Sequence, residues 1–588
     1  MATGKNKKWI SSSDLQQLKR LMKYAGPYRV QFIWSAILSI FLAFLGPLRP
    51  YLVELTVDKY IFPQDYRGLM IISIVSFLVL VIESFARYRF IYLTNWLGQH
   101  VVKNLRLKVF KHTLKLKLSY FDKTAVGTST TRTINDLETI NNVFTQGIIQ
   151  IIADLLTIFF VIGFMFYSNW RMALISMVSF PLILYATYVF KEGIKATFQK
   201  VRTQVALLNA FLQERITGMK IVQVFTAEER EYEKFKAINN EHKRANIRSV
   251  WYYSIFFPVV EIITALALAL MVWYGAQNVI KGLATVGQIT AFILYLNMLF
   301  RPLRMLADKF NTLQMGFVAA ERIFNVLDNT ESISDSGELE PGAFKGEVAF
   351  QHVWFAYKDD DWVLRNVNFT LKEGETLAIV GATGAGKSSV INTLNRFYEI
   401  QKGEILIDNH NIKDYTLEGL RRNIGMVQQD VFLFTGSIMD NITLYNESIS
   451  REQVIDAAKM LGAHEFIMRL PNNYDYDVME RGATLSLGQR QLISFIRALV
   501  YNPSILILDE ATSSVDVETE QIIQHAVENL IAQRTSIIIA HRLSTIQNAD
   551  KILLMEKGEV IEAGTHEEML NKNGSYKKLH EMQFKMQE

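Results

Sequence analysis

The segment Gly381-Ala-Thr-Gly-Ala-Gly-Lys-Ser388 constrains the fold of this chain more than any other stretch. It matches the phosphate-loop pattern G-x-x-x-x-G-K-[ST] at every fixed position. The apolar run Thr376–Val380 before it predicts a strand, and Ser389–Leu394 after it predicts a helix. A strand, a glycine loop and a helix N-terminus together present backbone N–H groups to a phosphate. The alternative is a chance glycine turn, and the motifs below argue against it.

These residues predict nucleotide binding. Lys387 would reach the β- and γ-phosphates, and the Ser388 hydroxyl would ligate Mg²⁺. The expected nucleotide-binding set in the loop is Gly381, Thr383, Gly384, Ala385, Gly386, Lys387, Ser388 and Ser389. Downstream, the apolar strand Ile505–Leu508 ends in two carboxylates. Asp509 would hold the Mg²⁺ site and Glu510 would polarise the attacking water.

The composition indicates a membrane part joined to a soluble part. Of the 588 residues, 50% are hydrophobic and 20% are charged, and the mean hydropathy is +0.12. The net charge of only +4 gives no case for nucleic acid binding. Cysteine is absent, which excludes disulfides, thiolate metal sites and a cysteine nucleophile. The short basic start Met1–Lys8 is not followed by an apolar core, so we expect a cytoplasmic N-terminus and no cleaved signal peptide.

Long apolar runs predict about six membrane spans. They are Val30–Leu48, a run beginning at Leu69–Ile82, Gly147–Tyr167, Met172–Phe190, Ile255–Val279 and Ile289–Leu306. The connections within successive pairs are short, whereas those at 100–145 and 191–250 are long, polar and helical in composition. Both long connections are rich in Lys and Arg, which marks the cytoplasmic side. We therefore expect the long loops and both termini to lie inside the cell.

Few ionisable residues interrupt these runs. They are Asp154 in the third, Glu261 in the fifth, and Glu83 and Arg87 near the end of the second. Each would cost at least ~2.5 kcal/mol at mid-membrane unless it faces a partner or a cavity. A structural role and a contact with transported cargo both remain open for these residues.

The second half of the chain predicts an α/β domain. Residues 325–345 shift to Asp, Glu, Ser, Gly and Pro, a linker composition. The expected organisation is therefore a transmembrane domain at 1–324, a linker at 325–345 and an α/β domain at 346–588. In the last, short β runs alternate with helices, which fits a largely parallel core sheet. The runs are Glu347–Tyr357, Thr376–Gly381, Glu404–Ile412, Ile505–Asp509, Ser536–Ala540 and Lys551–Ala563.

The segment Thr484-Leu-Ser-Leu-Gly-Gln489 leads into the helical stretch Arg490–Leu499. It resembles the signature sequence of ATP-binding cassette proteins, usually Leu-Ser-Gly-Gly-Gln. With the six spans before it, the whole chain resembles the exporter family of half-transporters, which includes bacterial multidrug exporters and the lipid A flippase. One position departs from the pattern, since Leu487 stands where glycine is usual. If that position needed φ > 0, leucine would cost about 1–2 kcal/mol.

The resemblance implies roles for further residues. Tyr357 is similar to the aromatic that stacks on adenine, and Gln429 to the glutamine that touches Mg²⁺ and water, with Gln428 as the register alternative. His541 resembles the switch histidine at the γ-phosphate. The loop Ser513–Asp516 resembles the one that crosses the dimer interface. The signature residues would close the site of the opposite cassette, and the nucleotide-binding set implied in this way is Ser486, Gly488, Gln489 and Asp516.

The resemblance implies an ATP-driven exporter that pairs with a second half-transporter chain and uses ATP and Mg²⁺. The expected fold is a six-span α-helical membrane domain with long cytoplasmic helical loops, followed by an α/β P-loop ATPase cassette. Tyr120–Gly127 and Glu214–Phe225 resemble the segments that couple cassette to membrane domain, and Glu480–Gly482 resembles a segment meeting them. We expect a multi-pass protein of the cell (inner) membrane, in contact with membrane lipid, with a hydrophobic or amphipathic cargo. A lipid or lipid A flippase, or one half of a heterodimer with unequal ATP sites, remains the alternative.

Competing classes fit less well. A soluble cassette ATPase of DNA repair or translation lacks six apolar spans. Importers generally resemble separate cassette and permease chains, whereas here the two are fused. A channel or regulator on the same scaffold is disfavoured because Glu510 and His541 are both present.

Overall fold

The chain forms two compact units. The computed structural model describes residues 12–333, 335, 337–509, 517–532, 534–540 and 543–584. The first unit, here the helical unit, comprises Met1–Leu114 and Ala125–Asn329. The second, here the α/β unit, comprises Lys115–Thr124 and Thr330–Glu588. A short segment from the first half of the chain therefore belongs with the second half.

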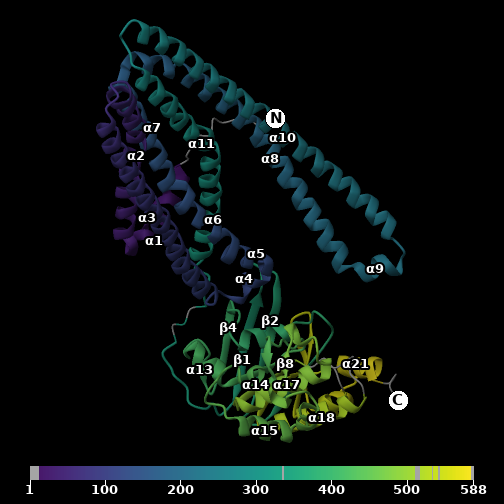
Figure 1. The fold of residues 1–588 in the computed structure, drawn as a ribbon. Coiled ribbons are helices and arrows are strands. Elements are labelled where there is room, and N and C mark those ends of the chain that lie inside the picture. The colour runs from purple at the N-terminus through teal and green to yellow at the C-terminus, as the bar shows by residue number, and fades with distance from the viewer. Residues whose placement is uncertain are drawn as a thin grey trace. The chain divides into compact units, whose positions relative to one another are not determined.

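The helical unit is built from long helices (Figure 1). They are α1 (Ser12–Ala25), α2 (Arg29–Thr56), α3 (Tyr66–Thr113), α7 (Ile149–Met177), α8 (Ser179–Thr217), α10 (Glu228–Ile280) and α11 (Val286–Leu327), with the short α5 (Val126–Thr131) and α6 (Leu137–Asn142) between α3 and α7. The six expected apolar runs all lie in this helical structure. Among the described residues, four stretches are long and apolar enough to cross a membrane: Leu15–Ile61, Tyr66–Thr113, Val126–Met177 and Glu228–Ile280. The fourth and sixth expected runs fall in α7–α8 and in α11.

The break between the third and fourth runs is a single residue. Asn169 has extended backbone angles inside α7. Its Oδ1 accepts hydrogen bonds from the backbone N–H groups of Arg171 and Met172, both at 3.2 Å. Asparagine caps a helix in this way, so a new helix begins here and the expected tight connection at 168–171 is where the chain turns.

Two long helices of the unit, α8 and α10, form a hairpin. Figure 1 shows α8 and α10 running side by side, with α9 (Met219–Val224) joining them at one end. There Nε of Arg215 donates to the Glu231 carboxylate at 2.5 Å, tying the end of α8 to the start of α10. The apolar side chains at this tip are exposed, including Ile221 (65%) and Phe225 (73%). The helices thus continue well beyond the apolar runs into polar sequence.

The three short connectors of the helical unit meet at its other end. Asp58, after α2, accepts hydrogen bonds from the Thr285 hydroxyl and from the Gly287 N–H at 2.8 Å, at the start of α11. The Ser168 hydroxyl donates to the Glu54 carboxylate at 2.8 Å. Gln288 donates to the Ser168 carbonyl at 2.9 Å. The end of α2, the break in α7 at Asn169, the end of α10 and the start of α11 therefore lie together at one end of the helical unit.

Asp154, one of the charges inside the apolar runs, has its partners within the unit. Lys309 of α11 forms an ion pair with its carboxylate, and both side chains are largely buried. Gln150 donates a further hydrogen bond to it at 3.1 Å. Because a buried charge is tolerated when it is paired, this geometry gives Asp154 a structural role.

The α/β unit contains two main sheets within the described residues. The larger has the order β12-β11-β3-β10-β9-β6, parallel except for β12. Its strands are β3 (Thr376–Val380), β6 (Ile424–Val427), β9 (Ile505–Asp509), β10 (Thr535–Ile539), β11 (Lys551–Glu556) and β12 (Glu559–Gly564). The smaller is antiparallel, ordered β2-β1-β4-β5, with β1 (Val348–Ala356), β2 (Trp362–Leu371), β4 (Lys402–Ile407) and β5 (His410–Asn411). The expected parallel core sheet is present; the separate antiparallel sheet was not expected.

Two buried apolar cores hold these sheets. Strands β3 and β10 are buried along their whole length, which is typical of a parallel sheet covered on both faces. One core packs the sheet against α15 (Arg451–Met460), α17 (Leu487–Val500) and α18 (Val517–Ile531). The other packs it against α12 (Lys387–Leu394) and the antiparallel sheet. The parallel register brings the carboxyl ends of β3, β10, β9 and β6 to one edge.

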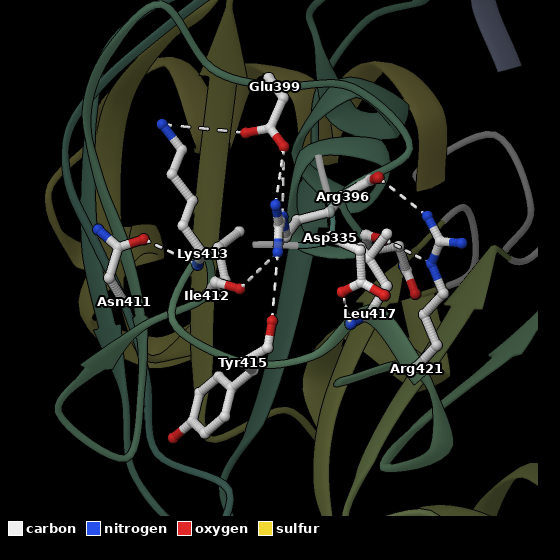
Figure 2. A network of polar contacts seen from close by, with 10 residues as sticks. Asp335, Arg396, Glu399, Asn411, Ile412, Lys413, Tyr415, Leu417 and Arg421 are labelled. Atoms are coloured by element: carbon white, nitrogen blue, oxygen red, sulfur yellow. Dashed lines mark hydrogen bonds and ion pairs between the residues drawn. The ribbon is translucent and has the colours of Figure 1, made fainter. Parts of the chain in front are cut away.

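The sequence expected as a linker is fastened to the α/β unit (Figure 2). We call Asp335 and residues 337–342 the strap. The Leu339 N–H donates to the Asp414 carbonyl, and the Thr416 N–H donates to the Leu339 carbonyl, both at 3.0 Å. The Asp335 carboxylate accepts from the Leu417 N–H at 2.9 Å. The strap therefore runs against the segment that leads through α13 (Leu417–Arg422) into β6.

A buried arginine supports the same segment from inside. Arg396, at 2% side-chain exposure, donates to the Ile412 carbonyl at 3.1 Å and the Tyr415 carbonyl at 3.5 Å. It also pairs with Glu399 at 3.0 Å. Arg421 in turn donates to the Arg396 carbonyl at 3.0 Å (Figure 2). Arg396 follows α12, so this network ties the nucleotide-loop helix to the path toward β6.

We expect Arg396→Met to destabilise the α/β unit by about 2–4 kcal/mol. The substitution leaves the buried carbonyls of Ile412 and Tyr415 without this donor, and leaves Glu399 with only Lys413, at 3.9 Å. Thermal unfolding of the purified full-length protein would measure this. The matched control is Arg422→Met, because Arg422 forms an exposed pair with Glu418 and should change stability by no more than about 0.5 kcal/mol. Equal effects of the two variants would contradict a special role for Arg396.

Candidate nucleotide-binding site

The glycine loop has backbone angles that other residues resist. Gly384 has φ +83° and Gly386 has φ +104°, both in the left-handed region that favours glycine. At Gly381 (φ +150°) a Cβ would lie 2.3 Å from the Met555 carbonyl oxygen. The loop leaves the buried end of β3 and enters α12 at Lys387. It is therefore a tight glycine turn at a helix N-terminus, the setting in which backbone N–H groups bind phosphates.

Lys387 lies across this loop. Its Nζ donates to the Gly381 carbonyl at 2.7 Å and to the Ala382 carbonyl at 3.1 Å. Burial lowers the pKa of Lys387, and the negative charge of Asp509 acts in the opposite direction. The ammonium is thus held at the mouth of the loop, within the electrostatic range of the carboxylate at the end of β9.

The remaining loop residues divide by exposure. Thr383, Gly384 and Ser388 are exposed, whereas Ala385, Gly386 and Ser389 are buried. The Ser388 hydroxyl is accordingly accessible to a ligand.

Asp509 and Gln429 lie at the same edge of the sheet as the loop. Asp509 is the last residue of β9, paired with Ile539 of β10, which pairs with Ile379 of β3. Gln428 and Gln429 follow β6 directly and are both exposed, so the structure leaves their register open. Carboxylate, hydroxyl and amide oxygens are the ligands that Mg²⁺ prefers. Ser388, Asp509 and Gln429 together fit a Mg²⁺ site completed by phosphate oxygens.

Tyr357 stands beside the loop helix. Its hydroxyl is 3.1 Å from the Ser389 hydroxyl, and the Asn392 amide donates to it at 3.3 Å. Its ring contacts Phe355 and Tyr398 edge-on at 4.7 and 4.9 Å between centroids. The side chain is 42% exposed. A planar base can therefore stack on the ring beside the phosphate loop.

The signature segment caps α17. The Ser486 hydroxyl accepts from the Gln489 N–H at 3.2 Å, and the Gln489 amide oxygen accepts from the Ser486 N–H at 3.0 Å. Leu487 begins the helix and is not among the described residues with positive φ. The strain considered for leucine at this position is therefore absent. Gly488 is buried in the first turn of the helix, and a helix N-terminus attracts an anion.

Three expected site residues lie outside the described residues: Glu510, His541 and Asp516. Glu510 follows Asp509 directly, and His541 follows Ala540 after β10. Asp509 and Ala540, the described residues that precede them, lie at the edge of the sheet that carries the glycine loop.

The structure adds a residue that sequence reasoning missed. Tyr398 donates its hydroxyl hydrogen to the carboxylate of Asp122 in α4 (Leu118–Lys123), inside the segment expected to couple the domains. Burial and this hydrogen bond raise the pKa of Tyr398. The Lys117 N–H also donates to the Glu331 carbonyl at 3.0 Å. A chain of contacts therefore runs from α4 through Tyr398 and Tyr357 to Ser389.

Comparison with known proteins gives a consistent result. Residues 32–303 match the family model of the ABC transporter transmembrane region, and residues 364–513 match the ABC transporter model. An ATP-dependent lipid A-core flippase of Syntrophus aciditrophicus is 35% identical over 99% of this chain and 97% of its own. A putative multidrug export ATP-binding/permease protein of Staphylococcus aureus is 35% identical over 96% of this chain and 100% of its own.

A solved structure agrees with them. A bacterial Atm1-family ABC exporter with ATP bound superposes with a TM-score of 0.76. It is 28% identical in sequence, and the match covers 95% of this chain and 98% of the other.

We expect Lys387→Ala to lower ATP turnover by about 10²–10³-fold, because it removes the loop's charge toward a developing phosphate anion. Steady-state phosphate release by the purified protein measures this, with membrane insertion and thermal stability unchanged. The exposed Lys459 serves as the control, since Lys459→Ala should leave turnover intact. Full activity of Lys387→Ala would remove the site assignment.

Tyr398→Phe should loosen α4 while sparing nucleotide binding. Losing one hydrogen bond to a carboxylate corresponds to about tenfold faster amide exchange in residues 118–123. Hydrogen-exchange mass spectrometry of the full-length protein resolves this segment. Tyr357→Phe is the control, because it removes the Ser389 contact but leaves Asp122 paired. Unchanged exchange in Tyr398→Phe would mean that other contacts hold α4.

Proposed function

This chain belongs to the ATP-binding cassette exporters and couples ATP hydrolysis to transport across a membrane, and we propose that it does so as a homodimer that exports hydrophobic or amphipathic compounds. One helical unit and one cassette make a half-transporter, which works with a second half. The proposal concerns which chain that second half is, what is carried, and which residues act.

The geometry of the signature segment carries the homodimer proposal. Ser486 and Gln489 form a complete cap at the start of α17, and Leu487 enters the helix without positive φ. The glycine loop, Lys387 and Asp509 occupy one edge of the sheet. One chain type therefore supplies both faces of an ATP site, and two copies placed head to tail make two equal sites.

Each residue then has a role in the composite site. Tyr357 stacks on adenine, the loop N–H groups and Lys387 bind the phosphates, and Ser486 and Gly488 of the second copy close the γ-phosphate side. Glu510 orients and polarises the attacking water, and Gln429 and His541 position water and γ-phosphate. Asp516 is assigned, from the family resemblance of its segment, to the contact with the second copy.

Mg²⁺ fits the oxygen donors of this edge. Ser388 and Asp509 would hold it, with Gln429 beside it. When bound, the ion neutralises charge on the β- and γ-phosphates. Within the described residues no group of three or more His, Asp or Glu side chains forms a metal cage, in keeping with an ion bound through substrate phosphates.

Cargo class is proposed from the relatives and from the helical unit. Relatives are named for lipid A-core and for multidrug export. The apolar helices carry exposed aromatic side chains, among them Phe159, Tyr185, Tyr188, Trp251 and Trp273. Aromatic faces of this kind suit amphipathic compounds. A lipid cargo is the second candidate, favoured by the flippase relatives.

The orientation follows from charge. The Lys- and Arg-rich parts of α3, α8 and α10 lie beyond the apolar runs, away from the end where the short connectors meet. Basic segments favour the cytoplasm. We place the protein in the cell (inner) membrane, with the cassette and both termini inside.

The decisive test is the behaviour of the chain alone. Purified into nanodiscs, it should have twice the monomer mass of 67.5 kDa and hydrolyse ATP cooperatively. Leu487→Gly should change turnover by no more than about twofold, because leucine causes no backbone strain there. Stimulation by a panel of lipids and amphipathic drugs would identify cargo.

The opposite result is equally clear. A monomeric, inert chain whose turnover is restored by Leu487→Gly would favour one half of a heterodimer with unequal sites. Stimulation by lipids alone would favour the flippase reading over multidrug export.

A further inference from the structure

A cluster of charges lies between α2 and α3 in the helical unit. Glu83 is buried, with 5% of its side chain exposed, and accepts from Arg87 at 2.6 Å and from Arg49 at 3.4 Å. The arginines themselves are 58% and 52% exposed. One carboxylate therefore faces two guanidinium groups. The cluster has a surplus positive charge, and that charge is at the surface of the apolar part of α3.

An opposite charge without a partner lies on α10. Glu261 is exposed within the apolar run 255–279. Across the described part of the chain it forms no ion pair and no side-chain hydrogen bond. The preceding turn carries Phe257 and Pro258, and the following turn Ile262, all exposed. A lone carboxylate in such a setting needs a cation or water to be tolerated.

The two charges lie at matching depth. At a rise of 1.5 Å per residue, Arg87 is about 32 Å along α3 from its start at Tyr66, and Glu261 is about 29 Å along α10 from its end at Ile280. Those two helix ends belong to the same end of the unit, where Asp58 binds the start of α11. Both charges therefore lie near the inner edge of a hydrocarbon layer about 30 Å thick.

We propose that Arg87 of one copy pairs with Glu261 of a second copy, so that α3 and α10 form an interface between protomers. This rests on the homodimer of the proposed function and adds where the two membrane halves meet. In a two-fold dimer the contact occurs twice, because each copy offers both residues. The surplus charge of one cluster is then compensated by the lone carboxylate of the other copy.

The surface beside Arg87 fits a partner helix. Along α3, immediately after Arg87, a groove of about 480 Å³ is lined by Tyr88, Ile91, Tyr92, Asn95, Trp96, Gln99 and His100. These residues recur at helical spacing on one side of α3. The rings of Tyr88 and Tyr92 stack at 6.3 Å, and those of Trp96 and His100 at 3.6 Å. A row of flat aromatic and amide groups next to a guanidinium suits the apolar, carboxylate-bearing face of α10.

The test is a charge cycle on the full-length chain. Arg87→Gln and Glu261→Gln should each raise the dimer dissociation constant at least about tenfold, measured by analytical ultracentrifugation in detergent. Glu261→Gln should have no further effect once Arg87 is already glutamine, because the two act on one contact. Arg87→Lys should retain most of the affinity.

A matched control separates this contact from general charge effects. Arg67 is also exposed on α3, but lies about 30 Å nearer the outer end than Arg87. Arg67→Gln should leave the dissociation constant unchanged. An equal loss in Arg67→Gln, or independent losses from Arg87→Gln and Glu261→Gln, would overturn the proposal.

The absence of cysteine allows a second test that does not depend on stability. Chains carrying Arg87→Cys and differently tagged chains carrying Glu261→Cys are co-expressed and treated with a short thiol-specific cross-linker. A covalent species with both tags is expected. Pairing Arg87→Cys with Trp273→Cys, exposed on α10 about 18 Å nearer the outer end, should give none.

The remaining outcomes are distinguishable. A wild-type chain that stays monomeric rejects the homodimer, and this contact with it. A wild-type dimer without charge coupling or cross-link rejects this contact alone. An effect of Arg87→Gln that varies with anionic lipid, together with a silent Glu261→Gln, would assign Arg87 to a lipid headgroup instead.

Discussion

The parallel pairing of β3, β10, β9 and β6 is the constraint on which the site depends. Each strand ends at the same edge, so residues from distant parts of the chain meet there without long loops. The glycine loop follows β3, Asp509 is the last residue of β9, and Gln428 and Gln429 follow β6. Strands β3 and β10 are fully buried, and a slip of one residue would turn every side chain to the opposite face. The buried core therefore sets the register of the strands, and with it the positions of the site residues at their ends.

Much of this edge could be predicted from sequence because its strands are short, continuous apolar runs. The strand at Ile505–Asp509 has the predicted bounds, and β3 and β10 differ by one residue or less at each end. The strand β2 was not predicted, because the adjacent polar residues Arg365 and Asn366, both exposed, interrupt its apolar pattern. The hairpin β11–β12 was predicted only as one run. An irregular strand such as β2 depends on its pairing with β1, which a single sequence does not reveal.

The site residues also divide into those that the sequence could predict and those that it could not. The glycine loop was predictable because its backbone angles demand glycine at fixed positions. Tyr398 was not, because its contact with Asp122 joins residues 276 apart in the chain. The φ angle of Leu487 could not be read from residue type either. Roles for Glu510, His541 and Asp516 still rest on sequence and family.

The charges of the apolar runs look alike in sequence, yet the structure separates them. Asp154 is bound by Lys309 and Gln150 of its own unit, so the free-energy cost of burying its charge is offset within one chain. Glu83 faces two arginines, whereas Glu261 forms no ion pair with any residue that the structure describes. A chain that worked alone would carry both imbalances into lipid, where an unpaired charge is costly. Two copies remove both imbalances with one repeated contact, because each copy is deficient where the other has a surplus. The uncompensated charges of Arg87 and Glu261 thus belong to the single half-transporter, and they are neutralised when two copies assemble.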